Sequence, residues 1–279
     1  MIFDDTVCLL GEGPLWHPER DELFWFDILA RRLHRKDQHW QFDEFVSAAG
    51  WVDAETLLVA SESSLSRFDI KTGGTEVVVA LEADNPVTRS NDGRADPQGG
   101  FWIGTMGKEA QTGAGSIWRF YKGELRQLVP GITIPNAICF APDGETAYYT
   151  DTETQKILRV PLDADGWPDG EADVHVDLTG TEYRPDGAVV DTSGILWTAQ
   201  WGAGRVAGYD QSGQEVAAYD FPAAQTTCPA FGGVDFTTLI CTSAAAGQSQ
   251  SDLVARPASG QTFEVETPHK GQREHRVLL

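Results

Sequence analysis

The sequence predicts an all-β protein, a six-bladed β-propeller formed by residues 1–279 as a single domain. Three observations support this prediction. Short apolar segments of strand type recur at an interval typical of propeller blades, turn residues separate them, and the 3.6-residue apolar periodicity of amphipathic helices is almost absent. With 279 residues, 41% of them hydrophobic and nine of them Trp, the chain has enough apolar material for a large core.

Six apolar segments mark the repeats, and successive segments begin 34 to 49 residues apart. Most follow a turn rich in Asp, Pro and Gly, and several precede a second strand with an apolar-basic-apolar stretch. The segments are residues 23–27, 57–61, 101–105, 147–151, 196–200 and 239–243. Each repeat is expected to form one blade, and the N-terminal strand is expected to complete the last blade. A β-sandwich has no reason to repeat at this period, and the coils of a β-helix are much shorter.

Charge and cysteine content limit the partners and the location of the protein. The chain has 21 Lys and Arg against 42 Asp and Glu, and its net charge of −21 would repel nucleic acid and anionic membranes. No segment is long and apolar enough for a membrane span, and the N-terminus does not resemble a signal peptide. Cys8, Cys139, Cys228 and Cys241 are widely separated, as expected for reduced thiols. We therefore expect a cytoplasmic protein with no nucleic-acid or membrane partner and no need of an oligomeric partner.

Polar residues occupy the same position in most repeats. Counting back ten or eleven residues from each apolar segment gives the innermost strand of the predicted blade, which lines the axial channel. The six positions are Glu12, Ser47, Asn91, Asn136, Asp186 and Cys228. Carboxylates and carboxamides that converge on the axis need a cation, and their hard oxygens suit Ca²⁺, Mg²⁺, Mn²⁺ or an oxygen-liganded Zn²⁺. Taken singly, Asn and Asp beside Gly or Pro are equally typical of ordinary turns.

Short motifs surround these positions. They are GEGPLWH at residues 11–17, RSNDG at 89–93, GTM at 104–106, PNA at 135–137, RPDG at 184–187 and FGG at 231–233. Together and in this order, they resemble the SMP-30/gluconolactonase/LRE family, which includes regucalcin, through nearly the whole chain. The resemblance implies a six-bladed propeller that holds one divalent cation on its axis and hydrolyses a sugar lactone.

The resemblance also implies a metal site. Matched position by position, Glu12, Asn136 and Asp186 are expected to be the protein ligands of one divalent ion, which could be Ca²⁺, Zn²⁺, Mg²⁺ or Mn²⁺. Asp186 is also expected to be the catalytic base. A bound cation would lower the pKa of Asp186, so hydroxide held by the metal is the alternative base. Cys228, in the same register, is the one thiol that could add a soft ligand.

Three further residues are expected to contact the substrate. By resemblance, Arg89 and Asn91 match the substrate-binding pair of the family, and Glu109 matches an acid on a loop over the site. Arg89 can donate paired hydrogen bonds to sugar hydroxyls or to a developing oxyanion. Trp201, directly after an apolar segment, could form a wall of the pocket.

The predicted activity is therefore metal-dependent hydrolysis of an aldonolactone such as glucono-, xylono- or arabinonolactone. Two alternatives remain open: a calcium-binding regulatory propeller and a metal-dependent aryl-ester or organophosphate hydrolase. Other chemistries lack their motifs, since the sequence has no nucleophile elbow, no P-loop and no HExxH. The six His residues lie outside the axial register, and His17 is expected to be a structural hydrogen-bond partner near Glu12.

Overall fold

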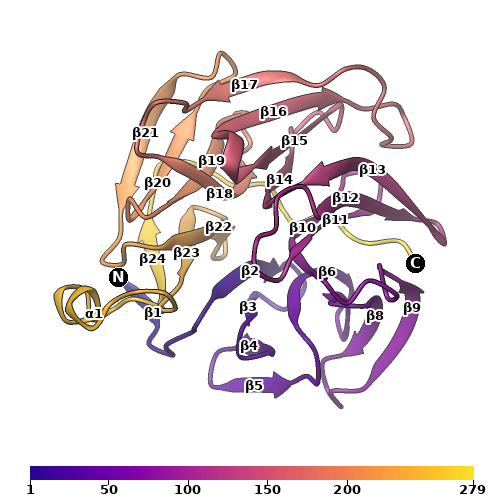
Figure 1. Cartoon of the computed structure of the whole chain (residues 1–279), viewed down its shortest axis with the longest axis horizontal. Coiled ribbons are helices and arrows are strands. Elements are labelled where there is room, and N and C mark those ends of the chain that lie inside the picture. Colours follow the sequence, from indigo (N-terminus) through magenta and orange to yellow (C-terminus); the bar gives the residue numbers. More distant parts are fainter.

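Six antiparallel four-stranded sheets surround a common axis in the computed structural model, which describes residues 1–279 (Figure 1). From the axis outward, the strands of blades 1 to 3 are β2 (Gly11–His17), β3 (Glu22–Asp27), β4 (Arg32–Arg35) and β5 (Gln38–Gln41); β6 (Val46–Asp53), β7 (Thr56–Ser61), β8 (Ser64–Asp69) and β9 (Thr75–Ala80); and β10 (Thr88–Ala95), β11 (Phe101–Gly107), β12 (Gly115–Tyr121) and β13 (Glu124–Ile132). Those of blades 4 to 6 are β14 (Pro135–Phe140), β15 (Thr146–Asp151), β16 (Lys156–Pro161) and β17 (Asp173–Asp177); β18 (Arg184–Val190), β19 (Leu196–Trp201), β20 (Arg205–Tyr209) and β21 (Glu215–Asp220); and β22 (Thr226–Gly232), β23 (Thr238–Ser243), β24 (Thr262–Glu266) and β1 (Ile2–Asp4). The predicted six-bladed propeller is confirmed.

The last blade combines the two ends of the chain. β1 pairs antiparallel with β24, so the N-terminal strand completes blade 6, as expected (Figure 1). The structure adds one α-helix, α1 (Gln250–Ala255), and one 3₁₀ helix, η1 (Thr152–Thr154). Neither is long and apolar enough to cross a membrane.

Each predicted apolar segment forms the second strand of its blade. Both faces of these strands pack against neighbouring blades, which explains why they are continuous apolar runs rather than alternating ones. The largest side chains on them, Trp25, Trp102 and Trp197, are fully buried. The core therefore consists of apolar layers between blades, such as the layer that joins Phe24 and Phe26 of blade 1 to Leu57 and Val59 of blade 2.

A buried ion pair in blade 3 is linked to blade 4 by a hydrogen bond from its arginine. Arg119 Nε donates to Asp96 Oδ2 at 2.6 Å, and both side chains are fully buried. Arg119 Nη2 donates to the carbonyl oxygen of Asp165, in the loop between β16 and β17. The guanidinium also lies over the rings of Tyr121 and Trp167, 4.4 and 4.3 Å from their centroids. One side chain thus connects a hairpin turn, an aromatic pair and the next blade.

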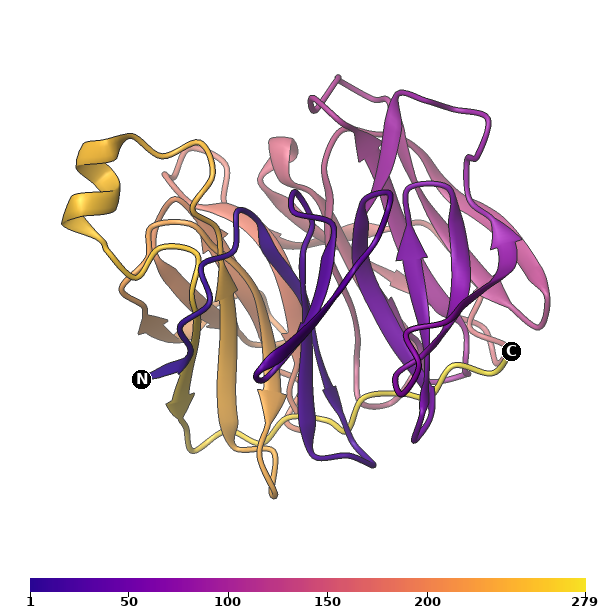
Figure 2. The same cartoon turned by 90° about the horizontal axis from the view of Figure 1, so that it is seen from below.

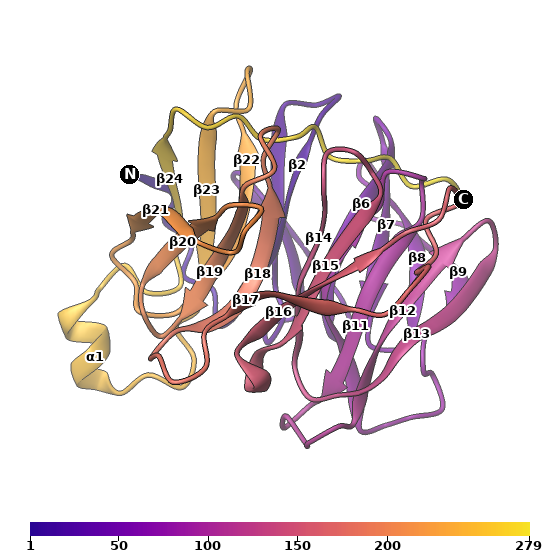
Figure 3. The ribbon, with the colours of Figure 1, turned by 90° about the horizontal axis from the view of Figure 1, so that it is seen from above.

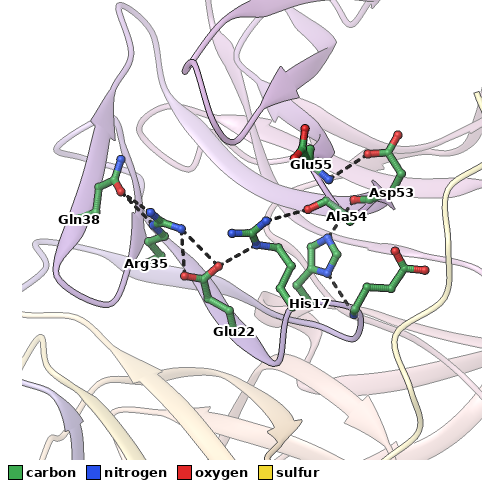
Figure 4. A network of polar contacts seen from close by, with 9 residues as sticks. His17, Glu22, Arg35, Gln38, Asp53, Ala54 and Glu55 are labelled. Atoms are coloured by element: carbon green, nitrogen blue, oxygen red, sulfur yellow. Dashed lines mark hydrogen bonds and ion pairs between the residues drawn. The ribbon is translucent and has the colours of Figure 1, made fainter.

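Polar contacts also connect blades 1 and 2 (Figure 4). The imidazole Nε2 of His17 lies 3.0 Å from the carbonyl oxygen of Asp53, and Arg20 Nη1 donates to the carbonyl of Ala54. Glu22 accepts from Arg20 and from Arg35, and Arg35 also donates to Gln38 Oε1. His17 is fully buried and burial lowers its pKa, so it is structural, as expected. Its partner, however, is in blade 2 and not near Glu12, which lies towards the other end of β2.

The C-terminal segment, residues 267–279, crosses one end of the propeller, opposite α1 (Figures 2 and 3). Its backbone accepts from Thr192 N–H of blade 5 and donates to Trp51 of blade 2 and Gly99 of blade 3. Gln272 Nε2 donates to the carbonyls of Phe140 and Val190, at the ends of β14 and β18. We call residues 267–279 the C-terminal strap.

Candidate active site

The innermost strand of every blade shifts its pairing register part way along its length. In five blades the shift begins at or within one residue of a predicted axial residue: Glu12, Ser47, Asn91, Asn136 and Asp186. Such bulges turn a side chain away from the regular direction of the strand. The residues after Glu12 and Asn136, Gly13 and Ala137, have φ angles of 52° and 54°. A left-handed conformation is strained for Ala, and such strain is common at functional sites.

Four of these residues line one cavity of about 340 Å³ at the start of the innermost strands: Glu12, Asn91, Asn136 and Asp186. This volume is at the lower end of the range for small-molecule sites. The lining residues are Leu10, Glu12, Arg89, Asn91, Met106, Ile134, Asn136, Thr152, Glu153, Arg184, Asp186 and Trp201. The cavity is thus polar at its base and partly apolar at its walls.

Hydrogen bonds fix the carboxamide of Asn136. Its Nδ2 donates to Thr152 Oγ1 at 2.9 Å, and Thr152 Oγ1 donates to the carbonyl of Pro185 at 2.8 Å. Its Oδ1 accepts from Asn91 Nδ2 at 3.1 Å. Because the nitrogen is occupied by Thr152, the oxygen keeps a second lone pair for a ligand in the cavity. Thr152 therefore holds the side chain of Asn136 directly. It also holds the backbone of Pro185, the residue that precedes Asp186.

Arg89 is buried beside Asn91 and lines the same cavity. Its Nη1 donates to Asn91 Oδ1 at 2.9 Å and to the carbonyl of Ser90 at 2.8 Å. Burial lowers the pKa of Arg89 to about 10, and the negative charge of Glu12 acts in the opposite direction. The guanidinium stays charged at neutral pH, and its other nitrogens remain free to donate to a ligand.

Burial disfavours the charged form of the two buried acids of the cavity, Glu12 and Asp186. Burial raises the pKa of Glu12 to about 8, and the charge of Asp92 adds to this effect. Burial and then the charge of Glu12 raise the pKa of Asp186 well above its ordinary value. Asp92, which also has a raised pKa of about 6 through burial, accepts from Ile138 N–H and does not line the cavity. The charge of Arg89 offsets the effect on Glu12 only in part. Two buried carboxyl groups with raised pKa values are groups that a bound cation would stabilise as anions.

The donor set fits a hard divalent cation. Glu12 and Asp186 offer carboxylate oxygens and Asn136 offers an oriented amide oxygen, so a bound ion would find oxygen ligands only. No group of three or more His, Cys, Asp and Glu side chains is arranged for a metal, so a site here would need the amide. Cys228 is buried outside the cavity, a side chain on Gly187 would collide with its Sγ, and burial raises the pKa of its thiol well above the ordinary value. The thiol is therefore not placed as a ligand.

The structure brings together five of the six predicted site residues: Glu12, Arg89, Asn91, Asn136 and Asp186. Glu109 is exposed and does not line the cavity; its backbone N–H donates to Gln111, and the neighbouring Lys108 pairs with Glu62. Ser47 is in the axial register, but its hydroxyl is bound to Ser90 and to the backbone of Asn91.

Sequence reasoning missed three polar cavity residues, Thr152, Glu153 and Arg184. Arg184 is the first residue of the quoted RPDG motif, so its position two residues before Asp186 could have identified it. Thr152 and Glu153 have no comparable signal, because they reach the cavity through the short helix η1. Trp201, for which the sequence left a place in the pocket wall open, lines the cavity.

Glu12→Gln is expected to raise the melting temperature of the metal-free protein at pH 8 and to change it little at pH 5. The pKa of Glu12 rises from 4.5 to about 8 on folding. Between these values the folded state binds more protons than the unfolded state, so the stability of the wild type falls as pH increases. Gln does not titrate and avoids this loss of stability. The melting temperature of the variant should therefore exceed that of the wild type by on the order of 5 °C at pH 8.

Melting curves of EDTA-treated wild type and variant from pH 5 to pH 9 measure this difference. Excess divalent cation serves as the control. With it, the wild type should have the higher melting temperature, because the variant has lost an anionic ligand. A difference that does not grow between pH 5 and pH 8 would contradict the prediction.

Comparison with known proteins gives consistent similarities along the chain. Residues 10–245 match the family model described as the SMP-30/gluconolactonase/LRE-like region. The crystal structure of a calcium-binding protein, regucalcin, from Agrobacterium tumefaciens str. C58 matches with a TM-score of 0.98 and 42% identity, covering 100% of this chain and 97% of that one.

Two curated relatives are named as lactonases. The 6-deoxy-6-sulfogluconolactonase of Pseudomonas putida is 34% identical over 91% of this chain and 90% of its own length. Pentonolactonase XacC of Haloferax volcanii is 33% identical over 98% of this chain and 96% of its own length. These similarities span the cavity and all six blades.

Proposed function

The chain belongs to the SMP-30/gluconolactonase/LRE-like family, and from this premise we propose that it hydrolyses aldonolactones with the help of a divalent cation held by Glu12, Asn136 and Asp186. The observation that carries this proposal is the cavity itself. Two buried acids with raised pKa values and an oriented amide oxygen lie beside a buried arginine in a space suited to a small sugar. The lactonase names of the relatives supply the substrate class.

The chemistry of lactone hydrolysis suits these residues. When bound, a divalent cation supplies Lewis-acid polarisation of the lactone carbonyl and lowers the pKa of a water molecule. Arg89 donates hydrogen bonds to the oxygen on which negative charge develops, and Asn91 holds the guanidinium in place.

Proton transfer is assigned to Asp186. Water adds to the carbonyl carbon while Asp186 accepts its proton, and the proton is then returned to the ring oxygen as the ring carbon–oxygen bond breaks. The product is the open-chain acid, which ionises at neutral pH.

A substrate panel tests the proposal. The protein is stripped with EDTA, reconstituted separately with Mg²⁺, Mn²⁺, Ca²⁺ and Zn²⁺, and assayed with a pH indicator on D-glucono-, D-xylono-, L-arabinono- and D-galactonolactone. Graded activity with several of these ions is expected, because an all-oxygen site does not select one of them strictly. Turnover of aryl esters or phosphotriesters in preference to every lactone, or activity that survives chelation, would overturn the proposal.

Arg89→Lys is expected to lower kcat/KM roughly tenfold to hundredfold, the range for losing hydrogen bonds from a charged donor. Lysine keeps the charge but not the paired donors of the guanidinium, so the loss isolates hydrogen-bond geometry. Steady-state kinetics on the best lactone give the result, and metal content by mass spectrometry is the control, which should match the wild type. Kinetics equal to those of the wild type would show that Arg89 has only a structural role.

A further inference from the structure

Three side chains at the solvent edge of the cavity have no part in the proposed chemistry. They are Glu153, Arg184 and Trp201, which we call the mouth cluster. The side chains of Glu153 and Arg184 are 55% and 48% exposed, whereas the proposed metal ligands are buried. A ligand that fills the cavity from its base would therefore meet the mouth cluster last.

The backbone fixes the mouth cluster relative to the proposed metal ligands. Arg184 precedes Asp186 by two residues on β18, and both residues line the same cavity, although the register of β18 shifts between Pro185 and Ala188. Arg184 also pairs with Trp201 across β18 and β19. Glu153 follows Thr152, the residue that holds Asn136 by a hydrogen bond.

The polar groups of the mouth cluster are available to a ligand. Arg184 and Glu153 form an ion pair with an N–O distance of 3.7 Å, and neither side chain makes a hydrogen bond within the chain. Exposed pairs of this kind contribute little to stability. Five guanidinium N–H donors and a carboxylate acceptor are thus free to be exchanged for sugar hydroxyls, with the indole ring of Trp201 beside them.

We propose that Arg184 is a specificity-determining residue, which binds the exocyclic group of the lactone and favours substrates that carry a hydrogen-bond acceptor there. This inference rests on the proposed lactonase function. With the carbonyl at the base of the cavity beside Arg89 and Asp186, the exocyclic carbon substituent is the group that reaches farthest from the lactone ring. Glu153 accepts from a hydroxyl on the same substituent, and Trp201 packs against its carbon atoms.

Two lactones that differ only in this group test the inference. D-glucono-1,5-lactone carries an exocyclic hydroxymethyl group, and D-xylono-1,5-lactone has the same ring stereochemistry without it. Arg184→Met keeps the apolar stem of the side chain and removes its donors. We expect kcat/KM to fall roughly tenfold or more on gluconolactone, mainly through KM, and less than twofold on xylonolactone. Arg184→Lys should recover part of the loss.

The matched control is Arg159→Met. Arg159 makes an exposed ion pair with Asp173 at 2.8 Å and does not line this cavity, so both lactones should be unaffected. Equal losses on the two lactones in Arg184→Met, or no loss on either, would overturn the inference while leaving the lactonase function intact. A wild type that hydrolyses none of the four lactones of the panel would instead overturn the proposed function, and the inference with it.

Discussion

Asp186→Asn is expected to remove bound divalent cation and to reduce lactone hydrolysis roughly a thousandfold or more. The substitution keeps the shape of the side chain, but it removes one of the two negative charges that would hold the cation and also the proposed proton acceptor. Lewis-acid catalysis accounts for several kcal/mol of transition-state stabilisation, and each 1.36 kcal/mol is about a factor of ten in rate. Metal content by mass spectrometry and kcat/KM on the best lactone are measured on the same preparation.

Asp92→Asn is the matched control for this variant. Asp92 is also buried and also has a raised pKa, but it does not line the cavity. Asparagine can still accept from Ile138 N–H through its amide oxygen. The control should therefore retain its cation and most of its activity. Full metal occupancy in Asp186→Asn would remove Asp186 from the proposed ligands.

Arg119→Met is expected to destabilise the fold by about 3 to 5 kcal/mol, the usual loss when one partner of a buried ion pair is removed. The remaining carboxylate of Asp96 would be buried without its cation, and the contacts of the guanidinium with Tyr121, Trp167 and the Asp165 carbonyl would be lost. Denaturant-induced unfolding of the metal-free protein measures the change in the free energy of unfolding.

Arg126→Met provides the comparison. Arg126 pairs with Glu124 at 2.9 Å, but both side chains are at least half exposed, so its loss should cost less than about 1 kcal/mol. Adding Asp96→Asn to Arg119→Met should recover part of the lost stability, since it removes the unpaired charge. If Arg119→Met and Arg126→Met were equally stable, Arg119 would not join the blades as described.

The propeller could be predicted because its signal is repeated along the chain. Every apolar segment is the buried second strand of a blade, and one register position, ten or eleven residues earlier, contains Glu12, Asn91, Asn136 and Asp186. The bulges that direct these side chains into the cavity are not visible in the sequence, because they arise from how each innermost strand pairs with its neighbour. Gly13 is compatible with such a bulge, whereas Ala137 gives no local sign of its left-handed backbone.

Positions set by loops were predicted less well. By resemblance, Glu109 matches a substrate-binding acid of the family through its place after Met106. The loop from Lys108 onwards is held by contacts with Glu62 and Gln111, however, and leaves Glu109 outside the cavity. Conversely, Glu153 lines the cavity because η1 turns the chain back towards β18. Contacts between segments distant in the sequence determine where Glu109 and Glu153 lie. The periodic pattern of the sequence does not reveal these contacts.

The C-terminal strap closes the axial channel at one end. Asn136 and Asp186 lie near the beginning of β14 and β18, and Gln272 is bound to the carbonyls at the far ends of the same strands. The ion pair between Arg94 and Glu274 adds a buried contact at that closed end. Any small molecule in the cavity therefore leaves by the opening through which it entered. One molecule must therefore leave before the next can enter, because no molecule can pass along the channel from one end to the other.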